Sequence, residues 1–351
     1  MKLVPLQVID LFCGIGGLTR GFLNVGLNVI AGFDIDTTCR YAYEHNNGVP
    51  FYHANVRELY RQDLEPLYDE DAVRILVGCA PCQPFSRMRS KMGQANTMDE
   101  KYNLLLEYGR LIEEMRPTII SMENVPQLQK TNVFAAFLEM LQRNGYHYDM
   151  KVVYCPDYGI PQTRRRFVLI GSLLGPIQIV NPTHDREDIH VGDFIRGLPA
   201  IAAGEVCEVD PLHQSARLST LNLQRIRASL PGGTWRDWPE ELRCACHRKK
   251  SGQTYGAVYG RMTWEQIGPT ITTQFYNYGT GRYGHPEQDR ALSLREGAML
   301  QTFPDNYSFI DPDVPFSFKD IGRHIGNAVP VRLGEIIGIS ILDHIRQQNE
   351  G

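Results

Sequence analysis

Two short segments of this chain carry side chains that could do chemistry together. The first is Pro81-Cys82-Gln83-Pro84-Phe85-Ser86, and the second is Glu123-Asn124-Val125. Each follows a short apolar run, at residues 74–79 and 118–122, that is typical of a buried strand. In an open parallel sheet the carboxyl ends of the strands form the edge where ligands bind, so both segments are expected to face one crevice. A cysteine there, with an acid opposite, is a nucleophile with a proton partner.

The elements that must position these residues alternate along the first half of the chain. Apolar runs occur at residues 8–12, 29–33, 75–77, 119–122 and 167–170, and helical patterns occur at 18–25, 103–115 and 133–144. This alternation predicts a doubly wound α/β domain over residues 1–174. The following sequence is rich in Pro, Gly and His and predicts a second, smaller, irregular domain over 175–290. Residues 291–351 contain a final apolar helix at 333–347, which is expected to return to the first domain.

Length and composition indicate an ordinary globular protein. The chain has 351 residues, of which 42% are hydrophobic, enough to bury a sizeable core. It contains no run of about 18 apolar residues, so a membrane helix is not expected, and the first residues do not resemble a signal peptide. A cytoplasmic location follows as an expectation. The eight cysteines are unevenly spaced, which favours reduced thiols over a disulfide framework.

The net charge of −4 gives no sign of a polyanionic partner, but one segment of the chain is strongly basic. Between Ala216 and Met262 there are nine Lys and Arg residues against three Asp and Glu residues, a local charge of +6. A segment that basic is a candidate surface for the phosphates of a nucleic acid. The alternative is a solvated face without a partner.

A glycine-rich loop follows the first apolar run. Cys13-Gly14-Ile15-Gly16-Gly17 lies between a predicted strand and a predicted helix, where exposed backbone N–H groups favour a polar or anionic ligand. The third glycine of the dinucleotide fingerprint is replaced by Thr19, which disfavours a nicotinamide cofactor. Asp34 ends the next strand and could accept hydrogen bonds from ribose hydroxyls, so a bound adenosine is predicted. The alternative is a tight turn that only packs helix on strand.

Taken together, the segments resemble the C5-cytosine DNA methyltransferase family over nearly the whole chain, from Leu11 to Val331. The matching segments, in family order, are Asp10–Gly17, Pro81-Cys82, Glu123–Val125, Gln162–Arg166, Arg290–Asp305 and Gly326–Pro330. The resemblance implies a Rossmann-like domain that binds S-adenosyl-L-methionine and releases S-adenosyl-L-homocysteine, and a target-recognition domain that binds double-stranded DNA. The cofactor-binding residues that it implies are Phe12, Gly14, Ile15, Gly16, Gly17, Asp34, Ile35, Asn55, Val56, Pro81, Leu105, Asn327 and Ala328. Asn55 stands where the family often has Asp.

The resemblance also assigns roles in the reaction. Cys82 is expected to attack C6 of cytosine, and Glu123 to supply an acid at N3, so that C5 becomes nucleophilic enough to accept a methyl group. Arg166, and less directly Arg164, are expected to hold the base or the acid in place. The target base must leave the duplex stack, and residues 86–101 are expected to close over the DNA. The DNA contacts predicted on this basis are Ser86, Arg87, Arg89, Arg261, Thr272 and Arg282.

Several expectations concern partners. A monomer is expected, with a restriction endonuclease as a companion in the same system. No metal is expected, because Cys244-Ala245-Cys246-His247 lacks the two-residue spacer of most structural zinc sites. Two rival functions stay open, namely methylation of cytosine in a transfer RNA and sequence-specific DNA binding without catalysis. The recognition sequence is not predicted.

Overall fold

The computed structural model describes residues 4–81 and 96–350, which form two compact units. The first unit comprises the described parts of Met1–Tyr154, Arg165–Pro182 and Val329–Gly351, and the second unit comprises Cys155–Arg164 and Thr183–Ala328. Four of the predicted site residues lie outside the described residues: Cys82, Ser86, Arg87 and Arg89.

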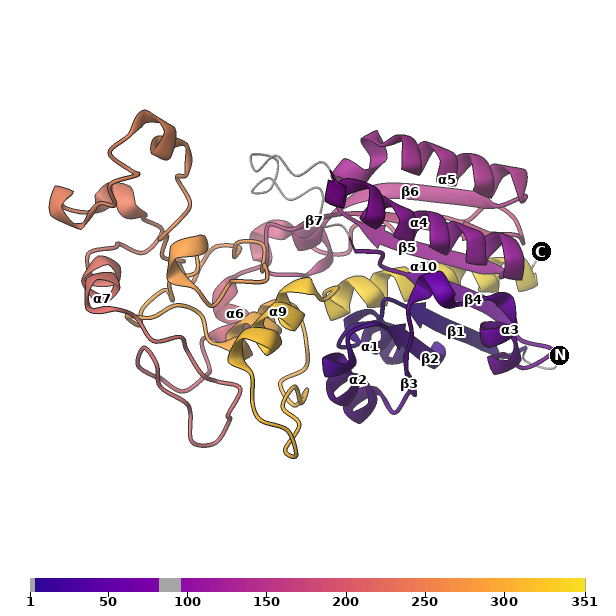
Figure 1. Cartoon of the computed structure of the whole chain (residues 1–351), viewed down its shortest axis with the longest axis horizontal. Helices are drawn as coiled ribbons and strands as arrows, with labels where there is room; N and C mark the ends of the chain where they lie inside the picture. Colours follow the sequence, from indigo (N-terminus) through magenta and orange to yellow (C-terminus); the bar gives the residue numbers. More distant parts are fainter. Residues whose placement is uncertain (1–3, 82–95, 351) are drawn as a thin grey trace. The chain divides into compact units, whose positions relative to one another are not determined.

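The first unit is built on a seven-stranded sheet, and the predicted doubly wound α/β class is confirmed. The strands lie in the order β3-β2-β1-β4-β5-β7-β6 (Figure 1). Their bounds are β1 Leu6–Leu11, β2 Asn28–Asp34, β3 Phe51–His53, β4 Val73–Gly78, β5 Ile119–Asn124, β6 His147–Tyr154 and β7 Arg165–Ser172. The strands β1 to β5 pair in parallel, whereas β7 runs antiparallel to both β5 and β6. Parallel strands need helices on both faces, since both faces are apolar.

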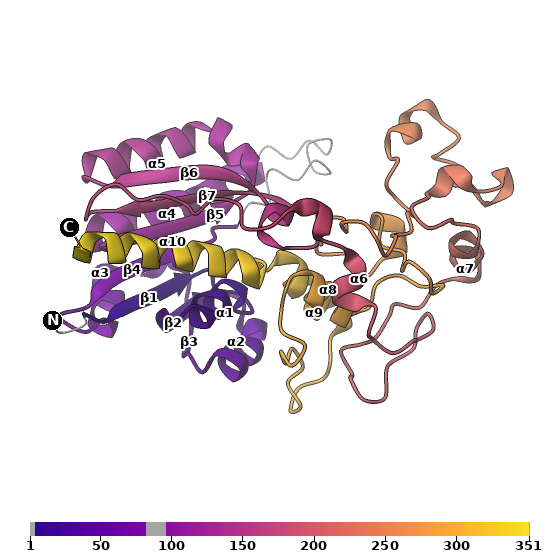
Figure 2. The same cartoon turned by 180° about the vertical axis from the view of Figure 1, so that it is seen from behind.

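Helices cover the two faces of this sheet. They are α1 Gly17–Asn24, α2 Arg40–Asn47, α3 Arg61–Leu64, α4 Asn96–Met115, α5 Asn132–Arg143 and α10 Val331–Glu350. Helices α4 and α5 pack on each other over one face, and α10 crosses the opposite face (Figures 1 and 2). Beneath α4 and α5, Tyr108 and Phe137 join the fully buried strand residues Leu76, Ile120 and Phe167 in one core. Burial of this apolar surface is the main force that holds the unit together.

The chain returns to the first unit at α10, which packs closely against α1. Two glycines make the close approach possible. A Cβ on Gly21 would collide with the backbone at Val331 and Glu335, and one on Gly334 would lie 2.8 Å from the Leu18 carbonyl oxygen. By length and composition alone, the helical stretch Phe318–Glu350 could cross a membrane. However, 67% of its most apolar 18-residue segment is buried inside the protein. A core helix of a folded domain passes the same criteria.

The second unit has short helices and long irregular segments. The α-helices described in it are α6 Val191–Ile195, α7 Thr220–Arg227, α8 Leu294–Leu300 and α9 Phe318–Asn327. Trp235, Trp238 and Tyr278 are buried with Ile226 in a core of their own. The role of this unit in target recognition stays a prediction.

Candidate active site

The candidate site lies at the carboxyl edge of the central strands. Leu11, the last residue of β1, pairs with Gly78, the last residue of β4, and Gly78 pairs with Met122 on β5. The loops after these strands therefore begin at the same level. Because β2 lies on the other side of β1, the strand order reverses between β1 and β4. In open α/β sheets such a reversal is the place where ligands bind.

The loop after β1 has an unusual backbone. Phe12, Gly14 and Gly16 have φ angles of 59°, 51° and 85°. Glycine adopts this left-handed region at little cost, but a phenylalanine there is strained, which marks a functional position. A Cβ on Gly14 would meet no atom of the described residues within 4 Å, so within that part of the chain the space beside the loop is open. Helix α1 begins at Gly17 and directs its free N–H groups toward the loop.

Asp34, at the end of β2, is held beside this loop. The Gly14 N–H donates to its Oδ2 at 2.9 Å, and the Asp36 N–H donates to its Oδ1 at 2.8 Å. Burial raises the pKa of Asp34 above its ordinary value, although these two hydrogen bonds oppose the shift. The Ile35 backbone also hydrogen-bonds to this carboxylate. Its two oxygens have about four lone pairs together, so the carboxylate can still accept a hydroxyl group of a ligand. The neighbouring Ile35 is 64% exposed and offers an apolar surface.

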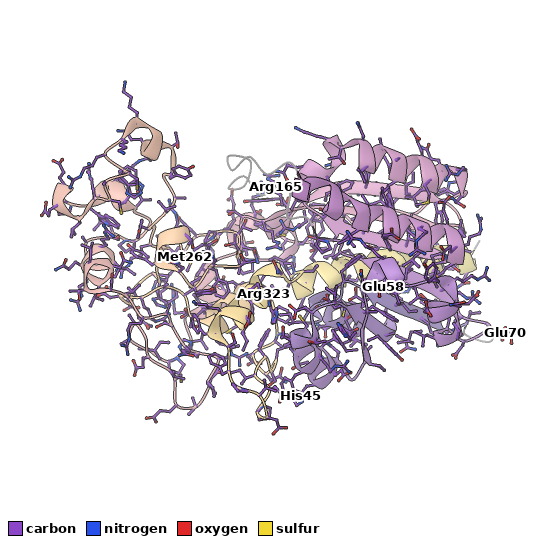
Figure 3. The ribbon with its side chains drawn as sticks, in the orientation of Figure 1. His45, Glu58, Glu70, Arg165, Met262 and Arg323 are labelled. Atoms are coloured by element: carbon purple, nitrogen blue, oxygen red, sulfur yellow. The ribbon has the colours of Figure 1, made fainter. Side chains whose placement is uncertain are left out.

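Asn55 is held at a turn after β3. Its Oδ1 accepts the Arg57 N–H at 3.2 Å, and its Nδ2 donates to Oε1 of Glu58, labelled in Figure 3, at 3.1 Å. One lone pair of Oδ1 therefore remains for a ligand. Two other predicted cofactor residues, Val56 and Leu105, are buried in the core of the first unit. Leu105 lies on α4.

Asp10 is a residue of this site that the residue-by-residue analysis missed. It is 1% exposed on β1, its Oδ2 accepts the Thr19 hydroxyl at 2.7 Å, and its Oδ1 has no hydrogen-bond partner among the described residues. Burial raises the pKa of Asp10 to about 7, with a smaller contribution from the charge of Asp34. A charged residue within the apolar run Val8–Phe12 was the signal that could have found it.

Glu123 and Arg166 form an ion pair at the end of β5. Their Oε1 and Nε atoms are 2.7 Å apart, and the two side chains are 9% and 16% exposed. The strand register explains the pairing, because Glu123 lies opposite Val168 on β7 and Arg166 is two residues from Val168 on the same face. Arg165, labelled in Figure 3, points elsewhere and stacks on Tyr154 with its guanidinium 4.4 Å from the ring centre. Of Arg165 and Arg166, only Arg166 therefore lies beside the Glu123 carboxyl group.

The loop after β4 is fixed to its neighbours on both sides. The Asn124 Nδ2 donates to the Ala80 carbonyl at 3.2 Å, and the Cys79 N–H donates to the Leu11 carbonyl at 3.4 Å. Pro81, the residue that precedes Cys82, is exposed. Burial, followed by the negative charge of Glu123, raises the pKa of the Cys79 thiol well above its ordinary value, so Cys79 stays a protonated, poor nucleophile.

Ile15 is buried in the first unit, whereas Arg164, Asn327 and Ala328 lie in the second unit. Arg164 is 3% exposed and donates to the carbonyls of Ile271 at 3.0 Å and Ala328 at 3.3 Å. It therefore holds two backbone segments together. Asn327 is the last residue of α9 and is exposed, and Ala328 follows it. The segment Gln162–Arg166 is thus divided, with Arg166 beside Glu123 in the first unit and Arg164 in the second.

Three predicted DNA contacts are described. Thr272 is exposed, with its hydroxyl 3.1 Å from that of Tyr283. Arg282 is half-buried and donates to the Gly232 carbonyl at 2.6 Å. Arg261 is only 7% exposed, and its guanidinium pairs with Asp289 at 2.7 Å. Its charge is engaged inside the second unit, so of these three residues Thr272 is the one at the surface.

A doubly wound sheet with a glycine loop at its strand reversal is typical of Rossmann-like cofactor-binding domains. The sequence profile described as "C-5 cytosine-specific DNA methylase" matches residues 6–343. The Type II methylase M.HgiDII of Herpetosiphon aurantiacus is 51% identical over 95% of this chain and 94% of its own length. The Type II methyltransferase M1.HphI of Haemophilus parahaemolyticus is 30% identical over 97% of this chain and 87% of its own length.

Solved structures agree on the fold. An E. coli prophage protein described as a DNA modification methyltransferase matches with a TM-score of 0.70 at 20% identity, covering 97% of this chain and 99% of that one. The Entamoeba histolytica methyltransferase EhMeth matches with a TM-score of 0.66 at 17% identity, with the same coverage. The profile match and the 51% identity decide the assignment. The chain belongs to the C-5 cytosine-specific DNA methylase family and is a DNA (cytosine-5) methyltransferase.

Proposed function

We propose that this enzyme methylates C5 of cytosine within a specific sequence of double-stranded DNA, with S-adenosyl-L-methionine as the methyl donor. The observation that carries the proposal is the Glu123–Arg166 pair, held at the same sheet edge as the loop that leads to Cys82. An acid, a fixed positive charge and a thiol are the groups that nucleophilic addition to a cytosine ring needs.

The described residues fit the proposed cofactor. The open space beside Gly14 admits a ligand, the Asp34 carboxylate can accept a ribose hydroxyl, and the exposed Ile35 can cover one face of an adenine. Asn55 can accept the adenine amino group through its remaining lone pair. The unpartnered Oδ1 of Asp10 can accept a hydrogen bond from a donor that reaches the end of β1. When bound, the cofactor supplies a methyl group on a positively charged sulfur.

The protein groups act on the base. Cys82, as a thiolate, forms a bond to C6, and Glu123 supports N3 with a proton, so that electron density is directed to C5 rather than left as charge on the ring. Arg166 keeps the Glu123 carboxyl group oriented and offsets negative charge near it. After methylation the C5 proton passes to a water molecule, and the bond between Cys82 and C6 breaks, which releases the thiolate and restores the aromatic ring. Glu123 and Arg166 need not move during this sequence.

The substrate base must be outside the duplex for this chemistry, since a thiol and a methyl donor approach opposite faces of its ring. Residues 86–101, with Ser86, Arg87 and Arg89, are proposed to close over the flipped nucleotide. The second unit is proposed to read the sequence, with Thr272 and Arg282 at the DNA and with Arg164 as a positioning residue. The enzyme is proposed to act as a cytoplasmic monomer beside a restriction endonuclease, as the Type II names of its relatives suggest.

Transfer of tritium from labelled S-adenosyl-L-methionine tests the substrate. The purified enzyme is incubated with duplex DNA or with transfer RNA, and label is expected only in the DNA. Label that enters only the RNA overturns the proposal, and tight DNA binding without transfer supports the regulator alternative instead. Bisulfite sequencing of DNA from cells that express the protein then identifies the methylated sequence.

A further inference from the structure

Three side chains of types that bind metals converge in the second unit. One ligand atom from each of Cys244, Cys246 and His247 lies within 4.8 Å of the other two. Two successive turns create this arrangement, because the His247 N–H donates to the Cys244 carbonyl at 2.9 Å and the Lys249 N–H donates to the Cys246 carbonyl at 3.2 Å. The short C-x-C-H spacing did not predict a metal site. In the folded chain, however, the two turns bring the three possible ligand atoms close together.

The backbone of this segment is tightly constrained. A Cβ on Gly252 would collide with the backbone of Cys246 and His247, so the following chain packs directly against the turn. Trp235 donates from its indole to the Tyr255 carbonyl at 2.9 Å, which ties the end of the segment to the core of the second unit. The three donors are therefore held together by the fold and do not lie on a free loop.

His247 is buried with an unused ring nitrogen. The side chain is 5% exposed, and its Nδ1 has no hydrogen-bond partner among the residues that the structure describes. The ring stacks on Trp235 with centres 4.2 Å apart and planes 20° apart, and the edge of Tyr259 packs against it at 5.9 Å. A buried ring nitrogen without a partner costs free energy, and coordination of a metal removes that cost.

Tyr259 holds one of the two cysteines. Its hydroxyl hydrogen-bonds to the Cys244 sulfur. The tyrosine is packed edge-on against Trp238 and Tyr278, each at 5.3 Å, and has a φ of 55° that is costly for this residue type. A hydrogen-bond donor fixed beside a sulfur is typical of the residues that orient metal ligands.

We propose that Cys244, Cys246 and His247 bind one zinc ion, with water as the fourth ligand. Two thiolates and a neutral imidazole form the soft donor set that zinc prefers, and the two thiol protons pass to solvent on binding. Two thiolates balance the charge of the ion, so the site is neutral within a basic segment. The zinc fixes this segment, with Arg248, Lys249 and Lys250, onto the tryptophan core of the second unit.

Metal content is the first test. Protein purified without a metal-binding tag is dialysed and measured by plasma mass spectrometry, and about one zinc per chain is expected. Cobalt added to the chelator-treated protein is expected to give a thiolate charge-transfer absorption and the visible bands of a tetrahedral site. The variant Cys246→Ser should lose both signals, and the matched control Cys207→Ser, which alters a buried cysteine outside the cluster, should keep them.

A second variant separates metal binding from packing. Tyr259→Phe keeps the ring and its aromatic contacts but removes the hydroxyl, so zinc affinity in competition with a chelator should fall by roughly 10–100-fold. Fluorescence of Trp235 and Trp238, which lie in the core of the second unit, reports whether each variant is folded. Wild-type protein that holds no more zinc than Cys246→Ser and gives no cobalt charge-transfer band overturns the proposal. A disulfide between Cys244 and Cys246 in freshly purified protein, found by mass spectrometry after alkylation, overturns it equally.

Discussion

The Glu123 carboxyl group gains its proposed role from three neighbours: Arg166 on β7, Asn124 beside it on β5, and Cys79 just after β4. Arg166 pairs with it from β7, the next residue Asn124 fixes the Ala80 carbonyl, and Cys79 lies close enough for the charge of Glu123 to raise the pKa of its thiol. The acid is therefore nearly buried, has a fixed orientation and sits beside the chain that leads to Cys82. Such a carboxyl group is suited to a proton transfer that depends on geometry.

Glu123→Gln tests this role. The amide keeps the shape of the side chain but cannot provide the acid at N3, so turnover should fall at least about 100-fold. Binding of S-adenosyl-L-methionine should be unchanged, because none of the residues proposed to hold the cofactor is altered. The matched control is Glu113→Gln, a half-exposed glutamate paired with Arg143 on the surface. A variant Glu123→Gln with a rate close to that of the control contradicts the assignment.

Asp10 gives the cofactor-free protein a pH dependence of its own. The pKa of Asp10 in the folded protein is about 7, above the ordinary value of 3.8. Between these two pH values the folded state keeps a proton on Asp10 that the unfolded chain has lost. The protonated Asp10 side chain therefore adds to the free energy of unfolding. This contribution is fully present below the ordinary pKa and is lost as pH rises through the folded pKa. The difference between the folded and the ordinary pKa sets an upper limit of about 4 kcal/mol on the contribution of Asp10 to the free energy of unfolding.

The measurement is urea unfolding of the cofactor-free protein between pH 5 and pH 8. The free energy of unfolding should decline across this range, and Asp10→Asn should decline less steeply, because its side chain does not titrate. Parallel pH profiles for the two proteins would show that Asp10 is not protonated in the folded state.

At the scale of elements, sequence patterns predicted the buried strands and missed the exposed ones. The runs at 29–33, 75–77, 119–122 and 167–170 lie on strands of the sheet, and the run at 8–12 does so up to Leu11, since strands buried on both faces are continuously apolar. β6 was missed because it is an edge strand with mixed polarity, HYDMKVVY, and β3 because it has only three residues. The glycine loop, Asp34 and Glu123 were found by their positions after strands. The Glu123–Arg166 pair needed the β5–β7 register, which no local pattern contains.

Helix α8 of the second unit begins at a buried ion pair. Arg290 and Glu296 are fully buried, with 2.6 Å between Nη2 and Oε1, and Glu296 also caps the helix by accepting the Ser293 N–H at 2.7 Å. Burial alone would raise the pKa of Glu296, but the hydrogen bonds and charge of Arg290 outweigh it and lower the pKa. The pair is therefore charged, and each member depends on the other.

Arg290→Met should destabilise the second unit by about 3–5 kcal/mol, because it leaves a buried carboxylate without its partner. The double variant Arg290→Met with Glu296→Leu should recover most of that loss, since no buried charge remains. Thermal unfolding followed by tryptophan fluorescence is a suitable measurement, because Trp235 and Trp238 lie in the core of this unit. A double variant no more stable than the single one would contradict this explanation.

At the scale of the whole molecule, charge is distributed unevenly. The chain carries −4 overall, while residues 216–262 in the second unit carry +6. Much of that positive charge is engaged within the unit, since Arg225 donates to the Leu242 carbonyl and Arg261 pairs with Asp289. Lys249 and Lys250 are exposed, so they are the stronger candidates for phosphate contacts.

Replacing Lys249 and Lys250 with Gln should weaken binding of all duplex sequences alike. The slope of log affinity against log salt concentration should fall in magnitude by about 2, one for each phosphate contact. Lys151→Gln on the edge strand β6 is the control and should leave the slope unchanged. Fluorescence anisotropy with labelled duplex over a range of salt concentrations measures both. An unchanged slope in the double variant would show that these lysines are solvated and do not contact DNA phosphates.

The proposed chemistry depends on a bond between Cys82 and C6 of a cytosine taken out of duplex DNA. The most direct measurement uses duplex DNA with 5-fluorocytosine at the methylated position, incubated with the enzyme and S-adenosyl-L-methionine and analysed on a denaturing gel. Fluorine cannot leave C5 as a proton does, so the wild type should stay covalently attached to the DNA, with Cys82 identified in the linked peptide by mass spectrometry. Cys82→Ala should bind the same duplex and form no adduct. Wild-type enzyme that methylates ordinary DNA but forms no adduct with the fluorinated duplex, or an adduct through another residue, would contradict the claim.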